Sequence, residues 1–148
     1  MSAALSKRPI DILLVEDNPE DVFLMRRALE RSRIRKRLHV VEDGEDALRF
    51  LHREAPHAEA PRPRLVLLDL FLPGMSGLEV LHRMNEDPAL RSIPVIVVTV
   101  AEDLPTLLNA YDARARAYVG KPTTSEGYDR LFERIEAFWF ETARLPAD

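Results

Sequence analysis

The chain has 148 residues, of which 46% are hydrophobic and 31% charged, and its formal net charge is −4. This length suits one domain with its own core, and a weakly acidic chain is not typical of a dedicated nucleic-acid binder. Cysteine is absent, which excludes disulfides and thiolate metal sites. The sequence has neither an apolar signal segment at its N-terminus nor a membrane-spanning apolar run, so we expect a cytoplasmic protein without membrane contact.

The N-terminal part of the chain predicts one strand and one helix. Ile10–Val15 is short and almost wholly apolar, as in a buried strand. Asn18 can cap the helix that follows, because its side chain can accept hydrogen bonds from the first free backbone N–H groups. The arginine-rich segment 31–37 is interpreted as a solvated helix end matched to the helix dipole, and the alternative is docking to an acidic partner.

The middle of the chain predicts two more strands and two more helices. A short strand, Leu38–Val41, precedes a helix capped by Asp43, and the proline-rich segment 55–64 predicts a loop. The apolar run Leu65–Leu68 predicts the third strand. Ser76–Glu79 is a capping box, in which the serine and the glutamate satisfy free N–H groups at the start of the third helix.

The C-terminal part continues the alternation. Strands are expected at Val95–Val98 and Ala117–Val119, with a short helix around 104–111 between them. Thr123–Glu126 forms a second capping box, which predicts a last helix that runs to about Thr142.

Five strands that alternate with five helices indicate an α/β fold with a parallel sheet. We expect the flavodoxin-like, doubly wound arrangement with strand order 2-1-3-4-5. One domain is expected over 1–148, with its core at about 9–142 and without an effector domain.

Polar side chains follow four of the predicted strands. Glu16 and Asp17 follow the first strand, Asp69 the third, Thr99 the fourth and Lys121 the fifth. The carboxyl ends of the strands in an open parallel sheet line one crevice, so these side chains should meet. Any one of them alone is more often a helix cap or a turn residue, but their joint placement favours a shared site.

Three carboxylates in one crevice would repel one another and raise one another's pKa. A divalent cation relieves this repulsion, and an all-oxygen donor set favours Mg²⁺ or Mn²⁺. A carboxylate beside such a cation, a lysine and a hydroxyl is equipped to accept a phosphoryl group. Asp69 would then be the nucleophile, while the cation and Lys121 would offset charge on the transferring oxygens.

These segments resemble the receiver domain of the response regulators of two-component signalling. The matching stretches follow one another in order: Ile12–Asn18, Leu67–Leu70, Pro73–Gly77, Ile96–Thr99 and Ala117–Pro122. Within that family, the proline-rich extension, the segment 85–94 and the aromatic last helix resemble the stand-alone regulators paired with bacterial phytochromes.

The resemblance implies that Asp69 accepts a phosphoryl group from a sensor histidine kinase of the phytochrome type. The chain would then signal through phosphorylation-dependent protein contacts and would not be an enzyme in the usual sense. The alternative is a receiver-shaped scaffold that binds partner proteins without phosphorylation. A haloacid-dehalogenase enzyme is rejected, since it needs a second acid two residues after the nucleophile, where this chain has Phe71.

The resemblance also implies a role for individual residues. The expected metal ligands are four: Glu16, Asp17, Asp69 and the backbone carbonyl of Phe71. Three residues would respond to the phosphoryl group: Thr99 and Tyr118 as a switch pair, and Lys121 as the phosphate-sensing lysine. The Lys121–Pro122 peptide bond would be cis, as in the family.

The last helix carries more apolar side chains than one core face needs. Leu131, Ile135 and Phe138 suffice to cover the sheet, whereas Phe132, Trp139 and Phe140 fall outside that stripe. We therefore expect a homodimer through the fourth helix, the fifth strand and the last helix, because aromatic residues make good anchors at interfaces. The alternative is that these rings pack under the C-terminal tail.

Overall fold

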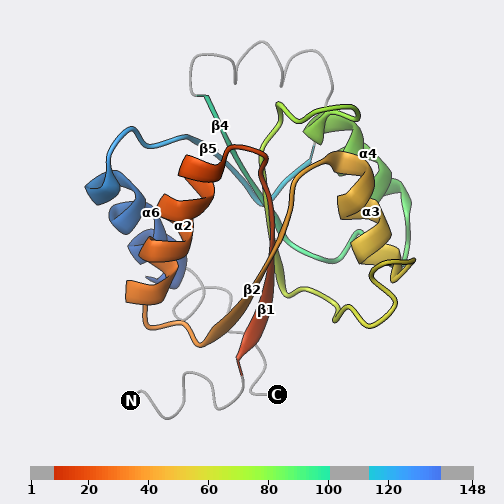
Figure 1. The fold of residues 1–148 in the computed structure, drawn as a ribbon, viewed down its shortest axis with the longest axis horizontal. Coiled ribbons are helices and arrows are strands. Elements are labelled where there is room, and N and C mark those ends of the chain that lie inside the picture. The colour runs from red at the N-terminus through yellow and green to blue at the C-terminus, as the bar shows by residue number, and fades with distance from the viewer. Residues whose placement is uncertain (1–8, 101–113, 138–148) are drawn as a thin grey trace.

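The computed structural model describes residues 9–100 and 114–137, which form a flavodoxin-like α/β fold (Figure 1). Five parallel strands make one sheet in the order β2-β1-β3-β4-β5. The predicted strand order is therefore confirmed. The strands are β1 (Ile10–Val15), β2 (Lys36–Val41), β3 (Leu65–Leu68), β4 (Val95–Thr99) and β5 (Ala117–Gly120).

Helices cover both faces of this sheet. The described helices are α2 (Pro19–Arg31), α3 (Gly44–His52), α4 (Gly77–Glu86) and α6 (Ser125–Ala137). Helices α2 and α6 lie side by side on one face, and α3 and α4 lie on the other (Figure 1). Four of the five expected helices are thus present, and the expected helix around 104–111 lies outside the described residues.

The core is divided between the two faces of the sheet. Ile12 and Leu14 of β1 belong to the cluster under α2 and α6, whereas Leu13 and Val15 belong to the cluster under α3 and α4. Successive side chains of a strand point to opposite faces, so a central strand buried on both faces must be apolar at every position. This explains the apolar run Ile12–Val15 within β1.

The helix starts follow the local chemistry of the sequence. Asn18 accepts hydrogen bonds from the backbone N–H groups of Glu20 (2.9 Å) and Asp21 (3.3 Å) at the start of α2. Ser76 accepts one from the backbone N–H of Glu79 (3.2 Å) at the start of α4. Both predicted caps are confirmed, and each satisfies N–H groups that the helix itself leaves free.

Three local predictions are wrong. Strand β2 begins at Lys36, two residues before the expected start, because the basic segment continues the pairing with β1. The start of α6 is capped by Thr124, whose hydroxyl accepts from the backbone N–H of Gly127 (3.0 Å), so the cap lies one residue later than expected. The cis peptide bond within the described residues is Ala55–Pro56, and Lys121–Pro122 is not cis.

Phe132 does not belong to an exposed stripe. Its side chain is 1% exposed and lies in the core cluster with Met25 and Leu29 of α2. The prediction that Phe132 is an interface residue is therefore wrong, because α6 packs against α2 as well as against the sheet. Trp139 and Phe140, the other two predicted interface residues, lie outside the described residues.

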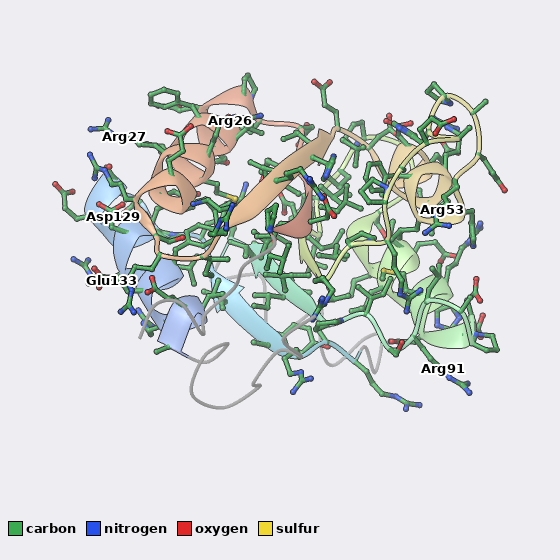
Figure 2. The ribbon with its side chains drawn as sticks, turned by 90° about the horizontal axis from the view of Figure 1, so that it is seen from below. Arg26, Arg27, Arg53, Arg91, Asp129 and Glu133 are labelled. Carbon is green, nitrogen blue, oxygen red and sulfur yellow. The ribbon has the colours of Figure 1, made fainter. Side chains whose placement is uncertain are left out.

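The basic segment after α2 has partners within the chain. Arg31 pairs with Asp129 of α6 (2.8 Å), and Arg33 pairs with Glu136 (3.4 Å). Figure 2 shows Asp129 and Glu133 on the outer side of α6, next to α2. Exposed ion pairs of this kind contribute little to stability, but they account for the basic helix end without an acidic partner protein. Among the described helices, none combines the length and apolarity needed to cross a membrane.

Candidate functional site

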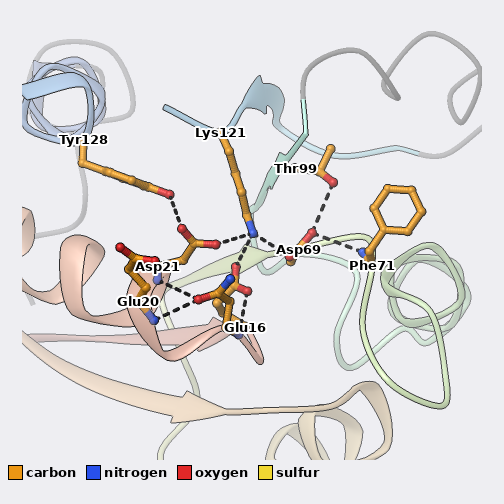
Figure 3. A network of polar contacts seen from close by, with 9 residues as sticks. Glu16, Glu20, Asp21, Asp69, Phe71, Thr99, Lys121 and Tyr128 are labelled. Carbon is orange, nitrogen blue, oxygen red and sulfur yellow. Dashed lines mark hydrogen bonds and ion pairs between the residues drawn. The ribbon is translucent and has the colours of Figure 1, made fainter. Parts of the chain in front are cut away.

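The carboxyl ends of β1, β3, β4 and β5 meet at one edge of the sheet, where their polar side chains form a single network (Figure 3). The network contains four of the predicted site residues and two that were not predicted: Glu16, Asp69, Thr99 and Lys121, with Asp21 and Tyr128. The predicted meeting of these side chains is therefore observed.

Asp69 lies at the centre of the network and is 5% exposed. Its Oδ1 accepts hydrogen bonds from the backbone N–H of Phe71 (3.1 Å) and from the Thr99 hydroxyl (3.2 Å). Its Oδ2 lies 3.0 Å from the Lys121 Nζ atom. Both oxygens are thus held by donors, which fixes the orientation of a carboxylate that stands at the open edge of the sheet.

Glu16 is the most buried acid of the site, at 1% exposed. Its Oε2 accepts from the backbone N–H of Asn18 (3.0 Å), and its Oε1 lies 3.1 Å from Lys121 Nζ. Burial and the neighbouring charge of Asp69 raise the pKa of Glu16 to about 7, although Asn18 and Lys121 act in the opposite direction. The protein therefore holds this carboxyl partly protonated near neutral pH.

Lys121 is the cation of the site and is surrounded by three carboxylates. Its Nζ lies 2.7 Å from Asp21 Oδ2, 3.0 Å from Asp69 Oδ2 and 3.1 Å from Glu16 Oε1. Burial lowers the pKa of Lys121, but the hydrogen bonds to Asp21 and Asp69 and the nearby negative charges raise it more. The net pKa lies above the ordinary value, so the side chain is an ammonium.

Asp21 and Tyr128 are the parts of the site that sequence reasoning missed. Asp21 lies in the first turn of α2, where an acid suits the helix dipole, and its second oxygen accepts from the Tyr128 hydroxyl (3.3 Å). Burial and the charge of Asp21 raise the pKa of Tyr128. No sequence signal links Asp21 to Lys121, since the two stand 100 residues apart.

Three acids of the site could hold a metal ion. Oxygen atoms of Glu16, Asp17 and Asp69 all lie within 4.8 Å of one another, with Asp17 exposed and the other two buried. Carboxylate oxygens are the donors that Mg²⁺ and Mn²⁺ prefer, so this donor set fits a hard divalent cation. The backbone carbonyl of Phe71 as a further ligand stays a prediction.

Residues 12–136 match the family model of the response regulator receiver domain. The chain belongs to this family. It is 37% identical to the response regulator Rcp1 of Synechocystis sp. PCC 6803 over 142 residues, which cover 96% of this chain and 97% of Rcp1. The family match identifies the receiver as a response regulator of two-component signalling and assigns it to no enzyme family.

Solved structures of phytochrome response regulators are similar to this receiver. The phosphorylated cyanobacterial phytochrome response regulator RcpA is 37% identical, with a TM-score of 0.84 over 94% of this chain and 99% of RcpA. The Mn²⁺-bound form of Rcp1 has a TM-score of 0.83 at 37% identity over 94% of this chain and all of that chain. The bacteriophytochrome response regulator RtBRR is 34% identical, with a TM-score of 0.76 over 95% of this chain and 85% of RtBRR.

Gly77 allows the start of α4 to pack closely against the backbone of Asp69. The backbone N–H of Gly77, at the start of α4, donates to the Leu70 carbonyl (2.9 Å). A Cβ atom at Gly77 would overlap the backbone carbonyl oxygen of Asp69. The helix therefore approaches the segment after β3 more closely than any other residue type allows.

Tyr118, the predicted switch residue, lies on β5 and is partly buried. It packs against the core cluster on the α3 and α4 side of the sheet. The ring of Tyr118 therefore contacts core side chains. The role of Tyr118 as a switch stays a prediction.

Proposed function

We propose that Asp69 is the phosphoacceptor of this receiver and that its donor is the phosphohistidine of a sensor histidine kinase in the cytoplasm. The observation that carries the proposal is the environment of Asp69, a nearly buried carboxylate oriented by Thr99 and Phe71 and placed 3.0 Å from the Lys121 ammonium. A nucleophile, a hydroxyl donor and a cation in contact are the parts that phosphoryl transfer to a carboxylate requires.

In the proposed step, a carboxylate oxygen of Asp69 forms a bond to phosphorus while the donor's P–N bond breaks. The electron pair of that bond returns to the imidazole nitrogen, and the product is an acyl phosphate. Lys121 offsets negative charge on the transferring oxygens, and the Thr99 hydroxyl can donate a hydrogen bond to one of them.

We propose that Glu16, Asp17 and Asp69 hold Mg²⁺, with Mn²⁺ as a substitute. A bound divalent cation would offset charge on the phosphoryl oxygens. The mutual closeness of three carboxylates supports this assignment, because only one lysine is available to balance them within the described part of the site. Asp17→Asn should weaken Mg²⁺ binding by about tenfold or more, because changing even an outer-shell partner of a metal site typically costs about 10–100-fold in affinity.

The experiment that tests the phosphoacceptor uses a small phosphodonor. Acetyl phosphate with Mg²⁺ should add one phosphoryl group to the wild type, detected by mass spectrometry, and Asp69→Asn should remain unmodified. Asp129→Asn serves as the matched control, since this aspartate pairs with Arg31 on the outer side of α6. Equal labelling of Asp69→Asn would refute the assignment, and an unmodified wild type would favour the phosphorylation-independent scaffold.

We propose a phytochrome-type kinase as the partner, because the similar regulators Rcp1, RcpA and RtBRR make this the first class of kinase to test. Phosphotransfer should be faster from such a kinase than from unrelated histidine kinases of the same organism.

The output is proposed to be phosphorylation-dependent contact with other proteins. Thr99 and Tyr118 are the proposed switch pair, and a Tyr118 ring that keeps one rotamer with and without beryllofluoride would contradict that role.

A homodimer through the expected helix around 104–111, β5 and α6 is also proposed. Support comes from a largely apolar hollow beside β5 and α6. It is lined by Ile96, Val119, Leu131 and Ile135 together with Ala117, Arg116 and Arg134. Trp139→Glu should convert the dimer to a monomer in sedimentation at tens of micromolar. The control is Phe23→Glu, which places the same acid on an exposed phenylalanine of α2, 59% exposed, and should stay dimeric. A monomeric wild type, with or without beryllofluoride, would rule the dimer out.

A further inference from the structure

The ammonium of Lys121 lies among three carboxylates. A protonated lysine carries three donors, and three carboxylates lie within 3.1 Å of Nζ, one each from Glu16, Asp21 and Asp69. The shortest of these distances, 2.7 Å, goes to Asp21, which stands on α2 and is outside the group of proposed metal ligands. Tyr128 of α6 donates to the other oxygen of the same carboxylate (Figure 3).

We propose that Asp21 is a positioning residue for phosphoryl transfer: oriented by Tyr128, its carboxylate holds the Lys121 ammonium beside Asp69. The inference rests on the proposed function, in which Asp69 accepts the phosphoryl group. Asp21 does not touch the reacting atoms and acts only through the lysine.

The physical need for such a residue follows from the lysine side chain. Its ammonium ends a flexible four-carbon stem, so its position depends on the contacts of the head group. The ammonium donates a hydrogen bond to Asp21 of α2 (2.7 Å) and forms an ion pair with Glu16, which follows β1 (3.1 Å). When Asp69 carries a phosphoryl group, the ammonium can turn an N–H from Asp69 to a phosphoryl oxygen while these two contacts persist. Lysine is thus placed before the reaction, which lowers the cost of ordering it in the transition state.

The environment of the pair strengthens this contact. The side chains of Lys121 and Asp21 are 16% and 19% exposed, so solvent and salt screen them less than a surface pair. Both Asp21 and its exposed neighbour Glu20 lie in the first turn of α2, where a negative charge interacts favourably with the helix dipole. If the dipole were the whole role of Asp21, the two acids would be equivalent. Only Asp21 of these two reaches the lysine.

The test measures the rate at which acetyl phosphate labels Asp69 under saturating Mg²⁺. Asp21→Ala should lower this rate roughly tenfold, the effect expected for two ionised residues in contact. Asp21→Asn should lose less, because its amide oxygen can still accept from the lysine, and Tyr128→Phe should lower the rate by about twofold to threefold. The control Glu20→Gln removes a negative charge from the same helical turn without that contact and should match the wild type.

A double-mutant cycle with Lys121→Ala separates positioning from a merely structural effect. If Asp21 acts through the lysine, Asp21→Ala should lower the rate no further once Lys121 is alanine. An equal loss in both backgrounds, an unchanged rate or a faster rate in Asp21→Ala would each overturn the inference while the proposed function stands. A wild type that acetyl phosphate does not label would overturn the proposed function and this inference with it.

Discussion

Replacing Glu16 with glutamine should stabilise the metal-free receiver above neutral pH. The Glu16 side chain is 1% exposed and shares Lys121 with two other acids. Burial, together with the charge of Asp69, raises its pKa from the ordinary value of 4.5 to about 7. The folded protein therefore binds this proton more tightly than the unfolded chain does. Glutamine has nearly the same shape as the protonated acid and never ionises.

The sign and size of the effect follow from linkage. Because the folded-state pKa is raised, the stability that protonated Glu16 contributes is fully present below about pH 4.5 and is lost as the pH rises through about 7. At about 1.4 kcal/mol per pH unit, the loss is of the order of 3 kcal/mol above pH 8. The glutamine variant keeps this stability at all pH values, so its advantage over the wild type should grow with pH.

Urea unfolding in the presence of EDTA, repeated between about pH 4 and pH 8.5, measures this difference. The free energies of unfolding of wild type and Glu16→Gln should nearly coincide at the acid end and should differ by about 3 kcal/mol at the alkaline end. Glu20→Gln, which removes the same charge from an exposed position, should follow the wild type throughout. A difference between wild type and Glu16→Gln that does not change with pH would refute the reasoning.

Two substitutions away from the carboxylates test the packing around the site. Phe132→Ala removes a ring that is 1% exposed and lies between α6 and α2, so it should lower the free energy of unfolding by about 3–5 kcal/mol. A loss below about 1 kcal/mol in urea unfolding would contradict its place in the core. Gly77→Ala would bring a methyl group against the Asp69 carbonyl and should cost about 1–3 kcal/mol in the same assay, and a stabilised variant would show that α4 can move away freely.

The central strands were predictable from sequence because burial on both faces leaves a simple pattern. Strands β1 and β3 have the predicted bounds, and β4 and β5 each extend one residue further. Strand β2 lies at the edge of the sheet, where only one neighbour restricts it. Its first residues, Lys36 and Arg37, are charged although their backbones pair with β1, so composition gave no sign of a strand there.

Phe132 shows why counting apolar stripes on a single helix can mislead. Tyr128, Leu131, Phe132 and Ile135 are all buried and follow the i, i+3, i+4, i+7 spacing of one wide helical face. The prediction assumed that α6 needed to cover only the sheet. In the fold α6 also packs against α2, so the buried face is wider than a sheet alone requires.

The site residues that lie directly at or after the ends of strands could be predicted, because the topology of a parallel sheet brings those strand ends together. Glu16, Asp69, Thr99 and Lys121 all satisfy this condition. Asp21 does not, since it lies in the first turn of α2, and its contact depends on how far the lysine side chain reaches. Such a contact is set by three-dimensional packing and leaves no periodicity in the chain.

Asp21 also bears on how the protein tolerates its own acidic site. Glu16 and Asp69 are buried close together, an arrangement that costs stability unless a cation lies between them. Lys121 supplies one positive charge, and Asp21 holds that charge at a fixed place while Tyr128 orients Asp21. The contacts of Lys121 with Glu16, Asp21 and Asp69 limit repulsion among the acids, and in the proposed function the same contacts place the lysine for phosphoryl transfer. Stability and the proposed chemistry thus depend on one ammonium, whose partners come from α2 and from the segments that follow β1 and β3.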